Sequence, residues 1–215
     1  MNKTNSSSNT SNIFKKIKRQ LSKGSYPIAN SEGEDSLLKK SADLGTHETP
    51  YYSPNQTNIL FLSKRGMSRA PLAREIMRHL LHLSDHFGSI RPSARGISDA
   101  YDFCPFDKRM IQSAQKFGYE LNGNSRRVNM AELSSANLIV PLDRESEEYT
   151  KTRNFYIHGA VRPIGQFLNP GQSPYIADPF ERDELWDIKA RYDEIIKSVE
   201  FGCGKMLRSL PCLIS

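Results

Sequence analysis

The chain has 215 residues, a net charge of +6 at neutral pH and a hydrophobic fraction of 37%. The length allows one domain of ordinary size plus an extension. The charge favours acidic partners, although ordinary solubility accounts for it equally well, and no nucleic-acid-binding motif is present. No apolar run approaches the ~18 residues of a membrane-spanning helix. The N-terminus has no apolar signal-peptide core. The three cysteines, Cys104, Cys203 and Cys212, are too few and too widely spaced for a disulfide framework. We therefore expect a cytoplasmic protein.

The first 55 residues differ in composition from the rest of the chain. Residues 1–55 are rich in Ser, Asn, Thr and Lys and show little periodicity, so we predict a disordered basic tail and linker. Residues 56–212 are predicted to form the folded domain. Within the tail, residues 12–23 have the pattern of a short basic amphipathic helix, which suits an anionic membrane surface or an acidic partner. A solvated tail with transient helicity is the alternative, because so short a helix is marginal alone.

From residue 58 onward, strand-like and helix-like patterns alternate. The first apolar run is continuous, as expected for a parallel strand that is covered on both faces. Repeated strand–helix units predict a parallel sheet with helices on both faces, and a ligand site at the carboxyl ends of the strands. We predict strands at 58–63, near 89–92, at 138–142 and at 159–164, and helices at about 71–86, 107–117, 145–153 and 181–200.

Local signals support several of these elements. Gly118 is placed to end the second helix, and Asn129 with Glu132 forms a capping pattern before a short turn. In the first helix we expect four residues to face the core: Leu72, Ile76, Leu80 and Leu83. In the last helix the expected core face is Leu185, Ile188, Tyr192, Ile195 and Val199.

The segment that joins the first strand to the first helix is the most informative part of the chain. It has a tight turn containing Gly66 and a helix opened by Pro71. Backbone N–H groups in such a turn converge on one point, and the helix N-terminus adds positive potential there. Arg69 can donate two parallel hydrogen bonds to phosphate oxygens. We therefore predict a phosphate-binding loop made of Lys64, Arg65, Gly66, Met67, Ser68 and Arg69.

This segment resembles the signature of the low-molecular-weight protein tyrosine phosphatases, which is strand, Cys, five residues, Arg, Ser/Thr, Pro, helix. Residues 93–96, 107–121, 136–143 and 177–180 also resemble elements of this family, in the family's order. The resemblance covers roughly residues 57–210. It implies an α/β three-layer sandwich around a central parallel four-stranded sheet.

The resemblance also implies roles for single residues. Ser63 stands at the position of the family's nucleophilic cysteine, which attacks phosphorus as a thiolate. A serine hydroxyl has a far higher pKa than a thiol and needs a neighbouring base, and no His or Lys at a matching position is evident. Asp178 matches the family's general acid, and Asp143 matches an aspartate that we interpret as structural support. Phe180 is expected to line the entrance and stack on an aromatic phosphoester.

Further departures from the family pattern point away from catalysis. Arg65 replaces a family Gly, Gly66 replaces a structural Asn, and Ala70 replaces the Ser/Thr that stabilises the leaving thiolate. Lys64 and Arg65 also make the edge of the loop more basic. Several coordinated losses favour a natural pseudophosphatase over a single engineered Cys→Ser change.

We therefore interpret the chain as a homologue of these phosphatases that is catalytically inactive or impaired. It is expected to bind phosphate or phosphotyrosine through residues 63–69, with a phosphotyrosine protein or another phosphorylated ligand as partner. The alternative is an active protein tyrosine phosphatase that hydrolyses phosphotyrosine with an atypical nucleophile. An arsenate reductase, which can share this fold, is disfavoured because it needs the loop cysteine and redox-partner cysteines.

No cofactor or metal is expected. His79, His82 and His86 lie on one helical face beside Asp85, but a solvated histidine-rich face explains them better than a metal site. Cys104 belongs to a segment that corresponds to a family loop near the active site, and we interpret it as a packing cysteine.

Overall fold

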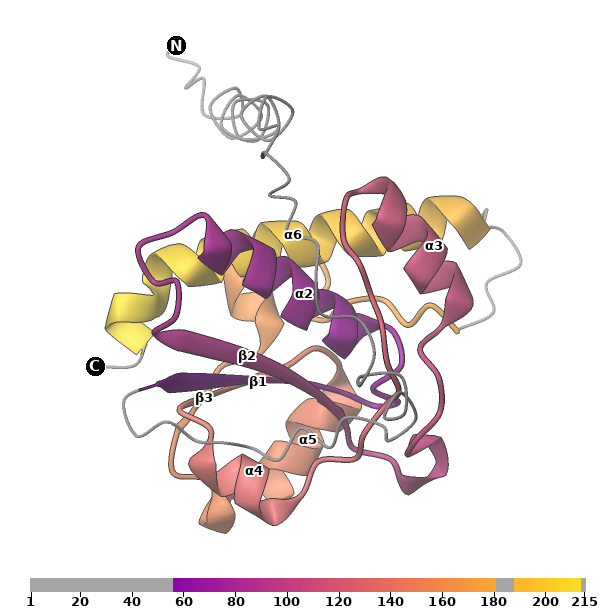
Figure 1. Ribbon diagram of the computed structural model, residues 1–215. Helices are drawn as coiled ribbons and strands as arrows, with labels where there is room; N and C mark the ends of the chain where they lie inside the picture. The colour runs from indigo at the N-terminus through magenta and orange to yellow at the C-terminus, as the bar shows by residue number, and fades with distance from the viewer. Residues whose placement is uncertain (1–55, 181–187, 214–215) are drawn as a thin grey trace, which may run out of the picture. The chain divides into compact units, whose positions relative to one another are not determined.

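The computed structural model describes residues 56–180 and 188–213. These residues form one sheet of four parallel strands, in the order β2-β1-β3-β4. The predicted parallel four-stranded sheet is therefore confirmed, and β1 has a hydrogen-bonded neighbour on each side (Figure 1). The strands are β1 (Thr57–Ser63), β2 (Ile90–Gly96), β3 (Leu138–Pro141) and β4 (Ala160–Val161).

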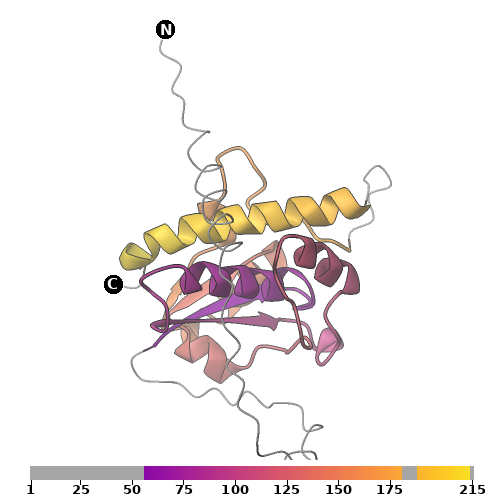
Figure 2. The same ribbon diagram turned by 45° about the horizontal axis from the view of Figure 1, so that its top comes forward.

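Helices cover both faces of this sheet, which gives the predicted three layers (Figures 1 and 2). One layer contains α2 (Arg69–His82), α3 (Lys108–Lys116) and α6 (Ile188–Leu213). The opposite layer contains α4 (Met130–Ser135) and α5 (Arg144–Thr152). Three short 3-10 helices complete the described secondary structure: η1 (Asp99–Tyr101), η2 (Asn154–Tyr156) and η3 (Ile164–Phe167).

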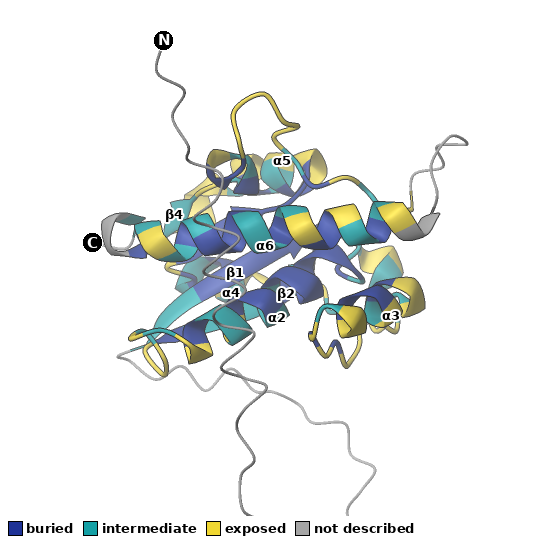
Figure 3. Cartoon of the chain, turned by 90° about the horizontal axis from the view of Figure 1, so that it is seen from above, coloured by how far each residue is buried: buried dark blue, intermediate teal, exposed yellow. Residues whose placement is uncertain are grey.

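The core is divided by the sheet because successive strand residues point to opposite faces. In β1, Ile59 and Phe61 pack with α2 and α6, whereas Leu60 and Leu62 pack on the α4 side. All four side chains are buried, as the dark blue of β1 in Figure 3 shows. The continuous apolar run thus makes β1 a strand covered on both faces, and it fixes the position of the loop that follows.

The structure corrects several predicted bounds. The helix expected at 71–86 is α2, which begins two residues before Pro71 and ends at His82, so Leu83 is 43% exposed and does not face the core. The strand near 89–92 continues to Gly96, where it pairs with the end of β1. The strand expected at 159–164 keeps only Ala160 and Val161, because the chain then turns into η3.

The last helix is longer than predicted, because its apolar face continues past residue 200 through Cys203, Met206 and Leu210. Tyr192, Ile195 and Val199 are buried, as predicted.

Three other predictions fall wholly or partly on residues that the structure does not describe. These are the tail at 1–55 with its helix at 12–23, the start of the last helix at 181–187, and the core positions Leu185 and Ile188; of Ile188 the structure describes the backbone but not the burial of the side chain. Among the described helices, none is long and apolar enough to cross a membrane.

Candidate functional site

The carboxyl end of β1 leads directly into the candidate loop. Ser63 is the last residue of β1 and Arg69 is the first of α2, so five residues connect the sheet to a helix N-terminus. Gly66 takes a positive φ of 69° inside this turn. A Cβ atom at Gly66 would lie 2.5 Å from the backbone nitrogen of Gly96, at the end of the neighbouring strand. The turn therefore needs glycine for its conformation and for its close approach to β2.

Several backbone donors of the loop have no acceptor. Within the described residues, the N–H groups of Arg65, Met67, Ser68 and Arg69 make no hydrogen bond. Ser68 is the N-cap of α2, but its hydroxyl oxygen accepts no N–H of the helix, and the hydroxyl donates to Asp107 (3.1 Å). Unsatisfied N–H groups at the start of a helix form an anion-binding site. The loop is thus able to receive a phosphate-like group.

Arg69 is buried and held from one side. Its Nη2 lies 2.8 Å from Oδ2 of Asp143, and its Nη1 donates to the carbonyl oxygen of Ile176 (2.9 Å). The contact with Ile176 is a hydrogen bond and the contact with Asp143 is an ion pair, and Nη2 also lies 3.7 Å from Oδ2 of Asp178. These contacts fix the orientation of the guanidinium.

Asp143 contacts the loop, Arg69 and the start of α5. It follows β3, is 3% exposed, and its Oδ2 accepts the Lys64 N–H (2.8 Å) in addition to the Arg69 contact. Its Oδ1 accepts the N–H of Ser146 (2.8 Å) and so caps α5. The carboxylate therefore joins the loop, the arginine and the start of α5, which agrees with the structural role expected for this residue.

Ser63 makes no hydrogen bond to a basic group within the described part of the chain. The side chain is buried at 1% exposure, and its Oγ accepts the Gly66 N–H at 3.2 Å. Among the described residues, no His or Lys makes a hydrogen bond to this oxygen. A serine without a base is a poor nucleophile.

Asp178 is paired with Arg65. The Nη1 atom of Arg65 donates to both carboxylate oxygens, at 2.9 and 2.7 Å, and Oδ1 also accepts the Phe180 N–H (3.0 Å). The Arg65 guanidinium carbon lies 4.6 Å from the centroid of the Phe180 ring and 5.4 Å from that of Tyr101. Burial lowers the pKa of Arg65, but Tyr101 and Asp178 outweigh it and raise the pKa overall. We call Tyr101, Asp178 and Phe180 the rim of the loop.

The second basic residue at this edge is paired as well. Nζ of Lys64 lies 2.8 Å from Oε1 of Glu145, and this hydrogen bond raises the pKa of Lys64 and lowers that of Glu145. The predicted basic edge is therefore largely balanced by carboxylates that come from distant parts of the chain.

Two supporting residues of the loop escaped the sequence analysis. Asp107 accepts hydrogen bonds from the hydroxyls of Ser68 (3.1 Å) and Tyr192 (2.6 Å), and its N–H donates to the carbonyl oxygen of Met67 (3.0 Å). Burial and the bond to Asp107 raise the pKa of Tyr192. Ser125 donates from Oγ to the carbonyl oxygen of Arg65 (2.7 Å). The sequence could identify Asp107 as the N-cap of α3, but it could not show that Asp107 also bonds to Ser68 of the loop.

The other candidate residues do not form a site in the structure. No group of three metal-ligating side chains occurs among the described residues. His79 and His82 instead make edge contacts with the rings of Tyr119 and Phe87, with centroids 5.6 and 4.8 Å apart. In the described part of the chain, the sulfur of Cys104 makes no hydrogen bond to the loop.

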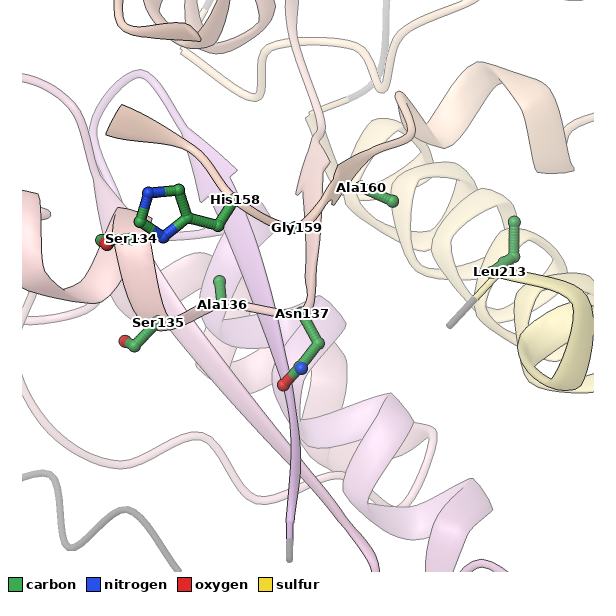
Figure 4. A pocket seen from close by; sticks show the side chains of 8 residues that line it. All are labelled: Ser134, Ser135, Ala136, Asn137, His158, Gly159, Ala160 and Leu213. Atoms are coloured by element: carbon green, nitrogen blue, oxygen red, sulfur yellow. Dashed lines mark hydrogen bonds between the residues drawn. The ribbon is translucent and has the colours of Figure 1, made fainter. Parts of the chain in front are cut away.

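A separate pocket of about 310 Å³ lies at the amino ends of the strands, where β3 and β4 begin (Figure 4). Its lining includes Ser134 and His158, whose Oγ and Nδ1 atoms are 3.2 Å apart. Within the described residues, no carboxylate bonds to this imidazole, so a nucleophilic triad is not formed. Ligands of parallel sheets bind at the carboxyl ends of the strands, which leaves the loop as the candidate site.

Comparisons with solved structures agree with this architecture. A protein tyrosine phosphatase from Entamoeba histolytica has a TM-score of 0.65 at 16% identity, over 73% of this chain and 97% of that one. YfkJ from Bacillus subtilis has a TM-score of 0.64 at 18% identity, over 73% and 96%. The arginine phosphatase YwlE from Geobacillus stearothermophilus has a TM-score of 0.60 at 16% identity, over 73% and 94%. At these identities the likeness shows the fold alone.

The sequence comparisons are more specific. A Synechocystis sp. protein, whose name places it among the low molecular weight protein-tyrosine-phosphatases, is 23% identical over 154 residues, which are 71% of this chain and 95% of that protein. The family model of the low molecular weight phosphotyrosine protein phosphatases matches residues 58–212. With the fold and the loop in place, the chain belongs to the low molecular weight phosphotyrosine protein phosphatase family.

Proposed function

We propose that this protein is a phosphate-binding member of its family that does not carry out the family's phosphoryl transfer. The observation that carries the proposal is Ser63, which stands where the family pattern has its nucleophilic cysteine. Among the described residues its Oγ accepts only the Gly66 N–H, and none of them is hydrogen-bonded to it as a base that could remove its proton. Without an attacking group, a bound phosphoester stays intact.

Retention of phosphate binding is supported by the donors of the loop. The N–H groups of Arg65, Met67, Ser68 and Arg69 have no partner among the described residues, and the Arg69 guanidinium is held by its ion pair with Asp143. Buried donors without acceptors are unfavourable, so an anion that accepts from them is stabilised. Binding and catalysis thus separate: the donors for binding are present and the nucleophile is not.

The state of Asp178 also supports the loss of turnover. A general acid must donate a proton to the leaving oxygen. Both oxygens of Asp178 instead accept hydrogen bonds from Arg65, and Nη2 of Arg69 is 3.7 Å away. In this arrangement both oxygens of Asp178 are already engaged as hydrogen-bond acceptors by Arg65.

The proposed role is to hold a phosphorylated ligand, such as a phosphotyrosine protein, by sequestration or scaffolding in the cytoplasm. Residues 12–23 would add a second contact with an acidic partner or an anionic membrane surface. The fold alone does not determine which phosphorylated side chain the protein binds, because the similar solved structures include both tyrosine and arginine phosphatases.

The proposal is tested by hydrolysis of an alkyl phosphate and of an aryl phosphate by the native full chain, the Ser63→Cys variant and Ser63→Cys/Arg69→Ala. We expect no turnover by the native chain, measurable turnover after Ser63→Cys, and its loss in the double variant. Tungstate binding by calorimetry is expected for the native chain and not for Arg69→Ala. Native turnover that disappears on Arg69→Ala would instead establish the alternative, an active phosphatase with an atypical nucleophile.

A further inference from the structure

Arg65 makes contacts that phosphate binding does not require. Its guanidinium carbon lies 4.6 Å from the ring centroid of Phe180 and 5.4 Å from that of Tyr101. The same guanidinium is bonded to both oxygens of Asp178. One side chain of the loop therefore contacts all three residues of the rim.

These contacts use the surfaces that an aromatic ligand needs. A phosphate seated in the loop carries its ester substituent outward past the rim, and an aryl substituent is stabilised there by the faces of aromatic rings. In this chain a cation already covers those faces, in the geometry of a cation–π contact. Arg65 is the group that the two rings share.

The ion pair makes Arg65 difficult to displace. Its side chain is 21% exposed and that of Asp178 is 19% exposed, so the pair is shielded from water more than an ordinary surface pair. An aryl group that enters would have to break both ring contacts and the hydrogen bonds to the carboxylate together. A substituent without an aromatic ring requires none of these contacts to break.

We propose that Arg65 is a specificity-determining residue that reserves the loop for phosphate groups without an aromatic substituent. The Arg65 guanidinium covers the rings of Tyr101 and Phe180, where an aryl group of a ligand would otherwise pack. The preferred ligand is therefore an alkyl phosphomonoester, as on a serine or threonine side chain, and not an aryl phosphate. This inference rests on the proposed phosphate binding. Among the phosphorylated ligands considered there, it favours those other than phosphotyrosine, whose phosphate carries an aryl group.

The test compares two phosphonates that carry the same anionic group and differ in the substituent. Methylphosphonate and phenylphosphonate are titrated calorimetrically into the native full chain and into Arg65→Ala. For the native chain we expect phenylphosphonate to bind no more tightly than methylphosphonate. For Arg65→Ala we expect a preference for phenylphosphonate of about tenfold or more, as two freed ring faces permit. The ratio of the two affinities cancels the loss of positive charge.

A matched control uses another arginine that covers a ring. The Arg126 guanidinium carbon lies 4.1 Å from the ring centroid of Phe103, which is 60% exposed. Arg126→Ala removes the same charge and the same type of contact, and it should leave the affinity ratio at the native value. In Arg65→Ala/Phe180→Ala the preference for phenylphosphonate should disappear, which would assign the gain to the rim.

The outcomes separate the two proposals. Methylphosphonate binding with a tenfold phenyl preference already in the native chain, or with no change of ratio in Arg65→Ala, would overturn the role of Arg65 and leave phosphate binding intact. Failure of both phosphonates to bind any variant would overturn the proposed function and this inference with it. If Arg65→Ala does not fold, Arg65→Gly, which restores the family residue, gives the same comparison.

Discussion

Replacing Asp143 by alanine should lower the free energy of unfolding by about 4–6 kcal/mol. The larger part comes from Arg69, because leaving one partner of a buried ion pair uncompensated costs about 3–5 kcal/mol. The Asp143 and Arg69 side chains are 4% and 5% exposed, so water cannot replace the lost carboxylate. The remainder comes from the N-cap of α5, whose loss costs about 1 kcal/mol.

Urea unfolding of the full chain measures this loss, with Asp99→Ala as the control. Asp99 also pairs with an arginine, Arg127, but its side chain is 73% exposed. Surface pairs contribute about 0–1 kcal/mol, so Asp99→Ala should change little. Asp143→Asn provides a milder variant, because it keeps an oxygen for the cap and loses only the charge; we expect about 3 kcal/mol.

A double-mutant cycle identifies the cause. If Asp143 acts by compensating Arg69, its removal should cost about 3–5 kcal/mol less in an Arg69→Ala background than in the native chain, because that part of the loss comes from the uncompensated arginine. Equal costs in both backgrounds, or a loss for Asp143→Ala no larger than that for Asp99→Ala, would refute the reasoning.

Two further predictions concern the loop and its edge. Gly66→Ala should cost roughly 2–5 kcal/mol, because the positive φ and the contact with the Gly96 backbone add, whereas Gly118→Ala, at φ 88° with no atom within 4 Å, should cost roughly 1–2 kcal/mol. Equal unfolding midpoints for the two variants would show that β2 yields to the extra methyl group. The hydrogen bond from Lys64 lowers the pKa of Glu145 in the folded state. The Lys64–Glu145 pair therefore stabilises the fold above about pH 4.3, the pKa of a glutamate in the unfolded chain. This stabilisation is lost as the pH falls through the lower pKa that Glu145 has in the folded state. Between about pH 6 and about pH 3, the native chain should lose up to about 1 kcal/mol more stability than Glu145→Gln, and equal losses would mean that the pair contributes nothing.

The fold was predictable from the sequence where a pattern repeats over enough residues. In β1 and β3 the apolar run is continuous, and the alternation between two core clusters follows directly from the geometry of a strand. A strand of two residues such as β4 has no period to detect, so its bounds were wrong. Leu83 was placed in the core because its spacing is helical, but the helix ends one residue earlier.

The candidate site divides in the same way. Gly66 and Arg69 lie in one short segment, where turn chemistry and helix polarity are local properties that the sequence displays. The pair of Arg65 with Asp178 joins residues 113 positions apart, and Ser68 with Asp107 joins residues 39 apart. Such contacts depend on how the sheet brings its carboxyl ends together, so the sequence showed a basic edge where the structure has a balanced one.

The unpartnered N–H groups of the loop make this part of the molecule a natural reporter in amide hydrogen exchange. They follow directly on β1, whose ladder hydrogen bonds protect it from exchange, so a change from slow to fast rates should fall between Ser63 and Met67. An anion that accepts from these groups would slow their exchange without altering the strand. Occupancy of the loop could thus be followed in a mixture of cellular compounds before any ligand is identified.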